Sequence, residues 1–548
     1  MMWRVNRSRH LGDAEHTPAD RLRRCALSGF GARLLWPHER PGPVSSPAAD
    51  ARSAPPRIDR AVLTELRAVL ENAEYTVERI EATLGVGELS AAPGVAAVHR
   101  RRLAGDDPFS VLSRLFVLGD PVDTCLVGAT FKPLTLDRLA ALGLLRSDDD
   151  DVRATVRLLP HGDYYLASDQ ARVESSADWV AGIHAPSITL AKLAVRRPVE
   201  AALDLGTGCG IQALLAAKHS GRVVATDVNE RALAFAGFNT ALNGIDVVEF
   251  RHGNLFEPVE GERFDLIVAN PPYVISPDAT YLYRDSGVPG DELCRRIVGA
   301  APEHLVEGGF AHILVSWSCP PGAVEGSAEP LREWVRDSGC DAWLLHYKTE
   351  DPVTHAAGWL SPMASTSVTE HDAALDRWLD FLRRSGIEAV GYGAVVLRRR
   401  STRENWVRLD ELPIDRLEPA SEHTLRVFEA EDYLAALPGE SALLEESFAL
   451  VDGHRLEQEL RCRDGRFEVH GQTLALTEGL AFRAGIDRST AMLLPHFGAG
   501  RRLVDVLAAA AADLEVEGED RERFASAALP VVRRLLELGF LVRSGSAG

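Results

Sequence analysis

The spacing of apolar residues divides the chain into four stretches. Residues 1–56 are rich in Arg, Pro, Ser and Ala and have no apolar period, which predicts a disordered arm. Residues 57–168 begin with helical spacing and end in two strand-like runs, 152–159 and 164–167. Helices followed by a β-hairpin favour a winged-helix-like module. It offers few basic residues to a DNA groove, so we expect a wing that contacts protein or acts as a scaffold.

Between residues 170 and 400, apolar runs of strand length alternate with helical stretches. This rhythm predicts an α/β domain with a Rossmann-like sheet of seven strands, the last two of which pair at one edge. The predicted strands are 201–205, 222–226, 247–251, 264–269, 310–317, 342–347 and 394–397. The segment 349–369 interrupts the rhythm and is predicted to be an insertion or a lid.

The last stretch, 402–548, is acidic and less periodic. Alternating residues near 456–470 predict strands, and the runs 502–511 and 523–538 predict two helices. We therefore expect a small α+β C-terminal extension, in which we identify no catalytic motif.

Composition and charge limit the classes of protein. The 46% hydrophobic and 26% charged residues are typical of a globular protein, and 548 residues predict several domains. No apolar run reaches the roughly 18 residues of a membrane span, and residues 1–14 lack the apolar core of a secretory signal. We expect a cytoplasmic protein without a membrane partner. Seven cysteines without CxxC pairs predict no metal site, and a net charge of −20 disfavours broad binding to a phosphate backbone.

A glycine-rich motif follows the first strand of the α/β domain. Asp204, Gly206, Gly208 and Gly210 form the pattern D-x-G-x-G-x-G between a predicted strand and a predicted helix. Glycines there allow a tight turn and a close approach of the backbone to a ligand, next to the free N–H groups of a helix N-terminus. The spacing differs from the dinucleotide fingerprint. Its acidic first residue suits the cationic amino-acid end of S-adenosylmethionine better than a pyrophosphate.

Two further strand ends predict contacts with a nucleoside. Asp227 ends the second strand, about 20 residues after the motif, where a carboxylate can accept hydrogen bonds from both ribose hydroxyls. The alternative is that it caps the following helix. After the third strand, Asn254 can hydrogen-bond the adenine edge and Leu255 can pack on its face. A plain turn explains these two residues nearly as well.

The fourth strand, 264–269, runs directly into Asn270-Pro271-Pro272-Tyr273. Two prolines fix the loop and remove backbone donors, which leaves carbonyl groups without partners in the chain. The side-chain oxygen of Asn270 and the carbonyl of Pro271 can accept the two hydrogens of an –NH2 group. Tyr273 offers an aromatic face to a planar substrate. At this spacing after the glycine motif, the loop predicts a site for a planar amino group.

These motifs together resemble those of class I S-adenosylmethionine-dependent methyltransferases of the NPPY type. The chain is most similar to the HemK-like enzymes, which methylate a glutamine side-chain amide in peptide release factors. The resemblance spans about 170–400 and is specific from about 200 to 275. It implies that S-adenosyl-L-methionine is the cofactor and that Asn270, Pro271 and Tyr273 hold the target. The implied cofactor-binding residues are Asp204, Gly206, Gly208, Gly210, Asp227, Asn254, Leu255 and Asn270. Asn254 stands where the family usually has an acidic residue.

Three functions remain open at this stage. The first is N-methylation of a protein glutamine, for which the acidic charge balance favours a partner such as a translation factor. The second is methylation of a base amino group in structured RNA, such as ribosomal RNA, or in DNA, because enzymes of that kind share the loop. The third is a DNA-binding regulator that senses S-adenosylmethionine without turnover. Neither the oligomeric state nor the purpose of the flanking modules follows from the sequence.

Overall fold

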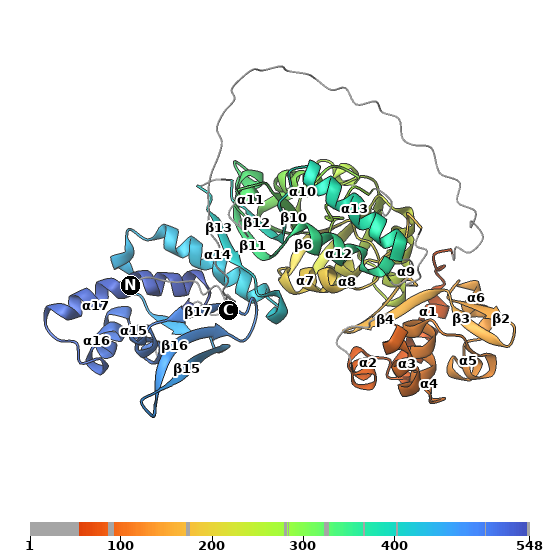
Figure 1. The fold of residues 1–548 in the computed structure, drawn as a ribbon, viewed down its shortest axis with the longest axis horizontal. Helices are drawn as coiled ribbons and strands as arrows, with labels where there is room; N and C mark the ends of the chain where they lie inside the picture. Colours follow the sequence, from red (N-terminus) through yellow and green to blue (C-terminus); the bar gives the residue numbers. More distant parts are fainter. Residues whose placement is uncertain are drawn as a thin grey trace, which may run out of the picture.

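A computed structural model gives the fold, drawn in Figure 1. It describes residues 54–85, 93–170, 176–278, 282, 284–285, 287–322, 328–364, 368–401, 404–498 and 500–544. The predicted arm at 1–56 lies almost wholly outside the described residues. The described chain forms an N-terminal unit, a central unit and a C-terminal unit, and the two outer units lie on opposite sides of the central one (Figure 1).

The N-terminal unit begins with helices and ends in two small sheets. Its elements are α1 (Arg60–Asn72), α2 (Val77–Leu84), α3 (Pro93–Arg102), α4 (Pro108–Ser113), β1 (Val122–Asp123), α5 (Thr124–Thr130), α6 (Leu136–Ala141), β2 (Leu145–Asp148), β3 (Asp151–Ala154), β4 (Val156–His161) and β5 (Tyr164–Asp169). The order from β1 to β3, with the sheet order β1-β3-β2, is that of a winged-helix module. The run predicted as a single strand, 152–159, is divided at Thr155 between β3 and β4, which belong to different sheets.

The central unit is a mixed sheet with helices on its faces. Its strands are β6 (Val199–Leu205), β7 (Ser220–Asp227), β8 (Val248–His252), β9 (Phe264–Ala269), β10 (Leu305–Cys319), β11 (Cys340–Glu350), β12 (Ala389–Arg399) and β13 (Val407–Glu411). Its helices are α7 (Ala185–Leu193), α8 (Ile211–Ala217), α9 (Glu230–Leu242), α10 (Glu292–Ala300), α11 (Glu329–Val335), α12 (Pro352–Ala364) and α13 (Val368–Arg384). All seven predicted strands are present. An eighth strand, β13, adds to the edge by pairing in parallel with β11.

The strand order is β13-β11-β12-β10-β9-β6-β7-β8, and β12 is antiparallel to both of its neighbours. The chain leaves β6 toward β7 on one side and later returns to β9 on the other. The carboxyl ends of β6 and β9 therefore flank the point where the strand order reverses. Open α/β sheets bind ligands at such points.

Two asparagines of α9 join the N-terminal unit to the sheet, a contact we call the N-terminal joint. Asn239 accepts from Ala167 N (2.7 Å) and donates to the Ala167 carbonyl (2.9 Å) and the Cys209 carbonyl (2.8 Å). Asn243 accepts from Tyr165 N (3.0 Å) and donates to the Tyr165 carbonyl (2.8 Å). The two side-chain amides thus pair with backbone N–H and C=O groups along β5, as the backbone of a neighbouring strand would. Apolar residues of α8 and α9 also share one buried core with the N-terminal unit.

The C-terminal unit packs against the far edge of the sheet. Its elements are α14 (Ser421–Ala436), β14 (Phe448–Leu450), β15 (His454–Arg463), β16 (Arg466–Leu476), β17 (Arg483–Ile486), α15 (Arg488–Leu493), α16 (Leu503–Asp513), α17 (Glu519–Glu537) and β18 (Leu541–Arg543). At this C-terminal joint, Arg398 of β12 forms ion pairs with Asp341 of β11 (2.7 Å) and Asp432 of α14 (2.6 Å). The Arg398 guanidinium lies 4.9 Å from the ring centroid of Phe428.

None of the helices in the described ranges is long and apolar enough to cross a membrane.

Candidate active site

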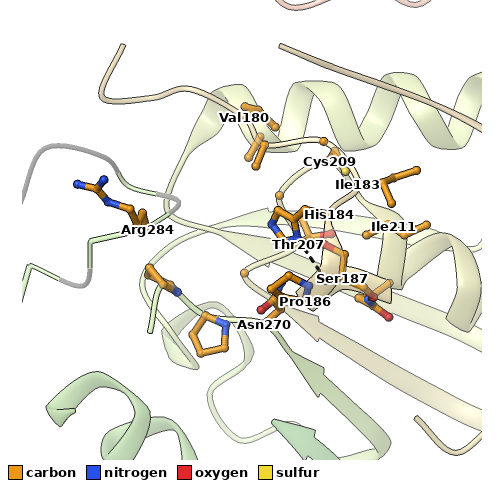
Figure 2. A pocket seen from close by; sticks show the side chains of 18 of the residues that line it. Val180, Ile183, His184, Pro186, Ser187, Thr207, Cys209, Ile211, Asn270 and Arg284 are labelled. Atoms are coloured by element: carbon orange, nitrogen blue, oxygen red, sulfur yellow. Dashed lines mark hydrogen bonds between the residues drawn. The ribbon is translucent and has the colours of Figure 1, made fainter. Parts of the chain in front are cut away.

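A cavity of about 1050 Å³ lies at the carboxyl ends of β6, β7 and β9, where the strand order reverses. Its wall is built from α2 and β4 of the N-terminal unit, the segment 179–188 that leads into α7, the loops after the central strands, and residues of α10 and α12. Figure 2 shows several of the lining side chains. Every residue proposed from the sequence lies on this wall except Gly210.

The glycine-rich loop has left-handed backbone at each of its three glycines. Gly206 (φ 73°) and Gly208 (φ 56°) lie on the cavity wall, and no atom lies within 4 Å of the position that a Cβ would take at either. At Gly210 (φ 87°) a Cβ would lie 2.9 Å from the Cβ of Ala236 in α9. Gly210, which was predicted to bind the cofactor, does not line the cavity, and its lack of a side chain lets α8 approach α9.

Asp204 is 1% exposed, and its carboxylate braces the glycine-rich loop. One oxygen, Oδ2, accepts from Thr207 Oγ1 (2.6 Å) and from Ala213 N at the start of α8 (2.9 Å). Burial raises the pKa of Asp204 to about 7, against the opposing effect of these hydrogen bonds. The side chain that the sequence suggested for a cationic ligand is therefore occupied largely in holding the loop.

Asp227 ends β7 and also braces this loop. Its carboxylate accepts from Gly208 N (2.9 Å) and Asn229 N (2.8 Å), and burial raises its pKa. A carboxylate has about four acceptor sites, so Asp227 keeps acceptor capacity for a ligand. Asn254 and Leu255 line the cavity beyond it, and Leu255 has a left-handed φ of 48°.

The segment Asn270-Pro271-Pro272-Tyr273 follows β9 along the cavity wall. The Tyr273 carbonyl accepts a hydrogen bond from Ser316 Oγ of β10, which fixes the end of the loop. Burial raises the pKa of Tyr273 well above its ordinary value, so its phenol is neutral. The Tyr273 ring meets Tyr392 edge to face, with centroids 6.4 Å apart.

The insertion predicted at 349–369 contributes α12, which lines the cavity through Gly358, Trp359 and Ser361. Because His355 Nε2 faces the Ile275 carbonyl (2.8 Å), we assign its proton to Nε2 and take Nδ1 as the acceptor from the Tyr392 hydroxyl. The same hydroxyl accepts from Trp359 Nε1 (3.0 Å). This buried network fixes α12 to the segment that follows the Asn-Pro-Pro-Tyr loop. No sequence motif indicated it.

His184 begins α7 as an unusual N-cap. Its Nδ1 accepts from Ser187 N (3.3 Å) and lies 2.9 Å from Ser187 Oγ, the hydrogen bond dashed in Figure 2. The side chain lines the cavity, which leaves it accessible to solvent. The protein around the cavity still desolvates the ring, and this lowers the pKa of His184. The neutral ring then carries its proton on Nε2 and offers a donor to the cavity.

Comparison with known proteins identifies relatives of the central unit. A family described as methyltransferase small domain matches residues 185–320, and domains of unknown function DUF7059 and DUF7782 match 72–155 and 425–543. The release factor glutamine methyltransferase of Xylella fastidiosa is 39% identical over 126 residues, which cover 21% of this chain and 46% of the relative. The ribosomal protein uL3 glutamine methyltransferase of Bradyrhizobium diazoefficiens is 41% identical over 124 residues, covering 20% and 39%.

A putative protein N5-glutamine methyltransferase of Methanocaldococcus jannaschii is 34% identical over 137 residues, which cover 24% of this chain and 68% of the relative. The chain spans less than half the length of the Xylella and Bradyrhizobium relatives. The residues that match the methyltransferase small domain, 185–320, include the glycine-rich loop and the Asn-Pro-Pro-Tyr loop.

Proposed function

Since the chain belongs to the protein glutamine methyltransferase family of class I methyltransferases, we propose that it transfers a methyl group from S-adenosylmethionine to a glutamine side-chain amide of a translation protein. The observation that carries this proposal is that the Asn-Pro-Pro-Tyr loop and the glycine-rich loop line the same cavity. The cavity can therefore bring a methyl donor and an amide acceptor together.

The residues present fit this cofactor. Gly206 and Gly208 leave open space beside the backbone, Asp227 keeps acceptor capacity for ribose hydroxyls, and Leu255 offers an apolar surface to a base. Ligand pockets are typically about 300–1,000 Å³, so a cavity of about 1050 Å³ has room for the cofactor and an acceptor side chain. When bound, the cofactor supplies an activated methyl group.

The loop residues act on the acceptor nitrogen, whose lone pair is delocalised into the amide. In our proposal Asn270 Oδ1 and the Pro271 carbonyl accept its two hydrogens. This orients the nitrogen and favours the pyramidal form in which its lone pair points at the methyl group. Tyr273, a neutral phenol, contributes its aromatic face rather than a proton. The released proton passes to water.

The Asn270→Ala variant tests the assigned role. We expect loss of at least two orders of magnitude in turnover, because the acceptor nitrogen loses one of its two orienting contacts. Cofactor affinity, measured by calorimetry, should stay within a few-fold. The matched control is Asn72→Ala, at an exposed asparagine that ends α1. Near-normal methyl transfer by Asn270→Ala would contradict the assignment.

The acceptor class is tested with labelled S-adenosylmethionine and extract from cells that lack this gene. We expect the label to be destroyed by protease, and mass spectrometry to find it on a glutamine of a release factor or ribosomal protein. Label destroyed by ribonuclease would replace the protein acceptor by RNA. Cofactor binding without transfer to any fraction would favour a sensor.

A further inference from the structure

Strand β4 of the N-terminal unit presents different residues on its two faces. Val156 and Leu158 are fully buried in the core of that unit. Arg157, Leu159 and His161 alternate with them and line the cavity. A strand's side chains point alternately to opposite faces, so this pattern makes one face of β4 a wall of the cavity. The unit that matches a domain of unknown function thus contributes directly to the ligand site.

Arg157 brings an unbalanced positive charge to this wall. Among the described residues no carboxylate lies within 4.0 Å of its guanidinium, and its Nε is buried without a hydrogen-bond partner. Burial lowers the pKa of Arg157, yet a guanidinium remains charged at neutral pH. Arg157 is half-buried, so a ligand that supplies an anionic partner is favoured over water around this charge.

The other charged residues of the wall do not need such a ligand. Arg284, the second arginine there, forms an ion pair with Asp285 at 2.7 Å. The remaining charged groups on the wall are the carboxylates of Glu81, Asp204 and Asp227. Among the described residues of the wall, Arg157 is therefore the arginine best placed to meet an anionic group of a ligand.

The N-terminal joint fixes Arg157 relative to the glycine-rich loop. Arg157 pairs with Ser168 of β5, directly beside Ala167, which Asn239 of α9 holds by two hydrogen bonds. Asn239 also donates to the carbonyl of Cys209, inside the glycine-rich loop. One side chain thus ties the strand pair that carries Arg157 to the loop that borders the cofactor site.

We propose that Arg157 forms an ion pair with the methionine carboxylate of S-adenosylmethionine and so makes the N-terminal unit a part of the cofactor site. This rests on the cofactor of the proposed function but not on the acceptor. The amide acceptor is neutral, whereas the cofactor brings a carboxylate in every catalytic cycle. The ion pair gives the N-terminal unit a role in cofactor binding.

The test compares the binding of S-adenosylmethionine with that of its decarboxylated analogue, which lacks only the carboxylate, by calorimetry without an acceptor. The wild-type protein should prefer the carboxylated ligand roughly 10- to 100-fold, as expected for a hydrogen-bonded charge pair. Arg157→Gln should bind both ligands with affinities within about threefold of each other, and Arg157→Lys should keep most of the preference.

The matched control is Arg153→Gln, an arginine of β3 whose ion pair with Asp148 (2.8 Å) lies away from the cavity wall. Equal weakening of both ligands in Arg157→Gln, or an undiminished preference for the carboxylated ligand, would overturn the proposal. Asn270→Ala should keep the wild-type preference. A failure of the proposed methyl transfer would therefore appear in the turnover assay, and a failure of the ion pair would appear in the calorimetric preference.

Discussion

The two outer units are attached to the sheet by different sets of contacts. At the N-terminal joint the amides of Asn239 and Asn243 bond to the backbone of β5. Beside them, Arg231 of the same helix forms an ion pair with Asp169 of β5. At the C-terminal joint, Arg398 is 5% exposed between two carboxylates. The joint that uses side-chain amides is the one beside the cavity.

The position of each joint agrees with this difference. The N-terminal joint lies on α9, next to the glycine-rich loop, and residues of α2 and β4 line the cavity. The C-terminal joint lies at β11 and β12, toward the opposite edge of the sheet (Figure 1), and no described residue beyond β12 lines the cavity. We therefore expect disruption of the first joint to change ligand binding, and disruption of the second to change stability alone.

The largest effect is expected from Asp341→Ala. Its carboxylate is 0% exposed, and its removal leaves part of the Arg398 charge uncompensated. Breaking a buried pair in this way costs about 3–5 kcal/mol of unfolding free energy, measurable by urea denaturation. Cofactor affinity should be unchanged at temperatures where the variant is folded. A large loss of affinity would contradict the separation of this joint from the cavity.

Asn239→Ala should cost somewhat less stability but should affect the ligand. It removes three hydrogen bonds to backbone groups of Ala167 and Cys209, worth about 2–4 kcal/mol in the buried joint. Because the same bonds hold β5 beside the glycine-rich loop, the affinity for S-adenosylmethionine should also fall. Unchanged affinity together with the expected loss of stability would show that the joint does not position the wall.

Tyr392→Phe tests the contribution of α12 to the cavity wall and should have the smallest effect. It removes the hydroxyl that bonds to His355 and accepts from Trp359, for a loss of about 1 kcal/mol. We expect a higher KM for the acceptor and an unchanged cofactor affinity. The control is Tyr433→Phe, since the Tyr433 hydroxyl is buried and has no hydrogen-bond partner among the described residues, so its loss should cost little stability. A changed cofactor affinity in Tyr392→Phe would assign α12 to the cofactor instead.

The sequence predicted those parts of the site that are local in the chain. Strand β9 has the predicted bounds, 264–269, and the motif residues follow strands that their own apolar runs define. The close packing of Gly210 against Ala236 was not predicted because Ala236 belongs to another helix. Arg157 was not identified because tertiary packing alone brings it to the cavity. His355 was not identified because its partners, Ile275 and Tyr392, are distant from it in the chain. Strand β13 was missed because its five residues pair with β11, more than 60 positions earlier.

The amide bonds between α9 and β5 also bear on how the protein is made. Tyr165 and Asn243 are 78 positions apart, so the outer edge of β5 leaves the ribosome well before its partner. At about 5–20 residues per second, that edge waits roughly 4–16 s for α9. An unpaired strand edge is a template for pairing with other chains. Nascent chains are therefore most exposed to aggregation in this interval. A fragment that stops before residue 239 lacks both asparagines, so the edge of β5 stays unpaired in it.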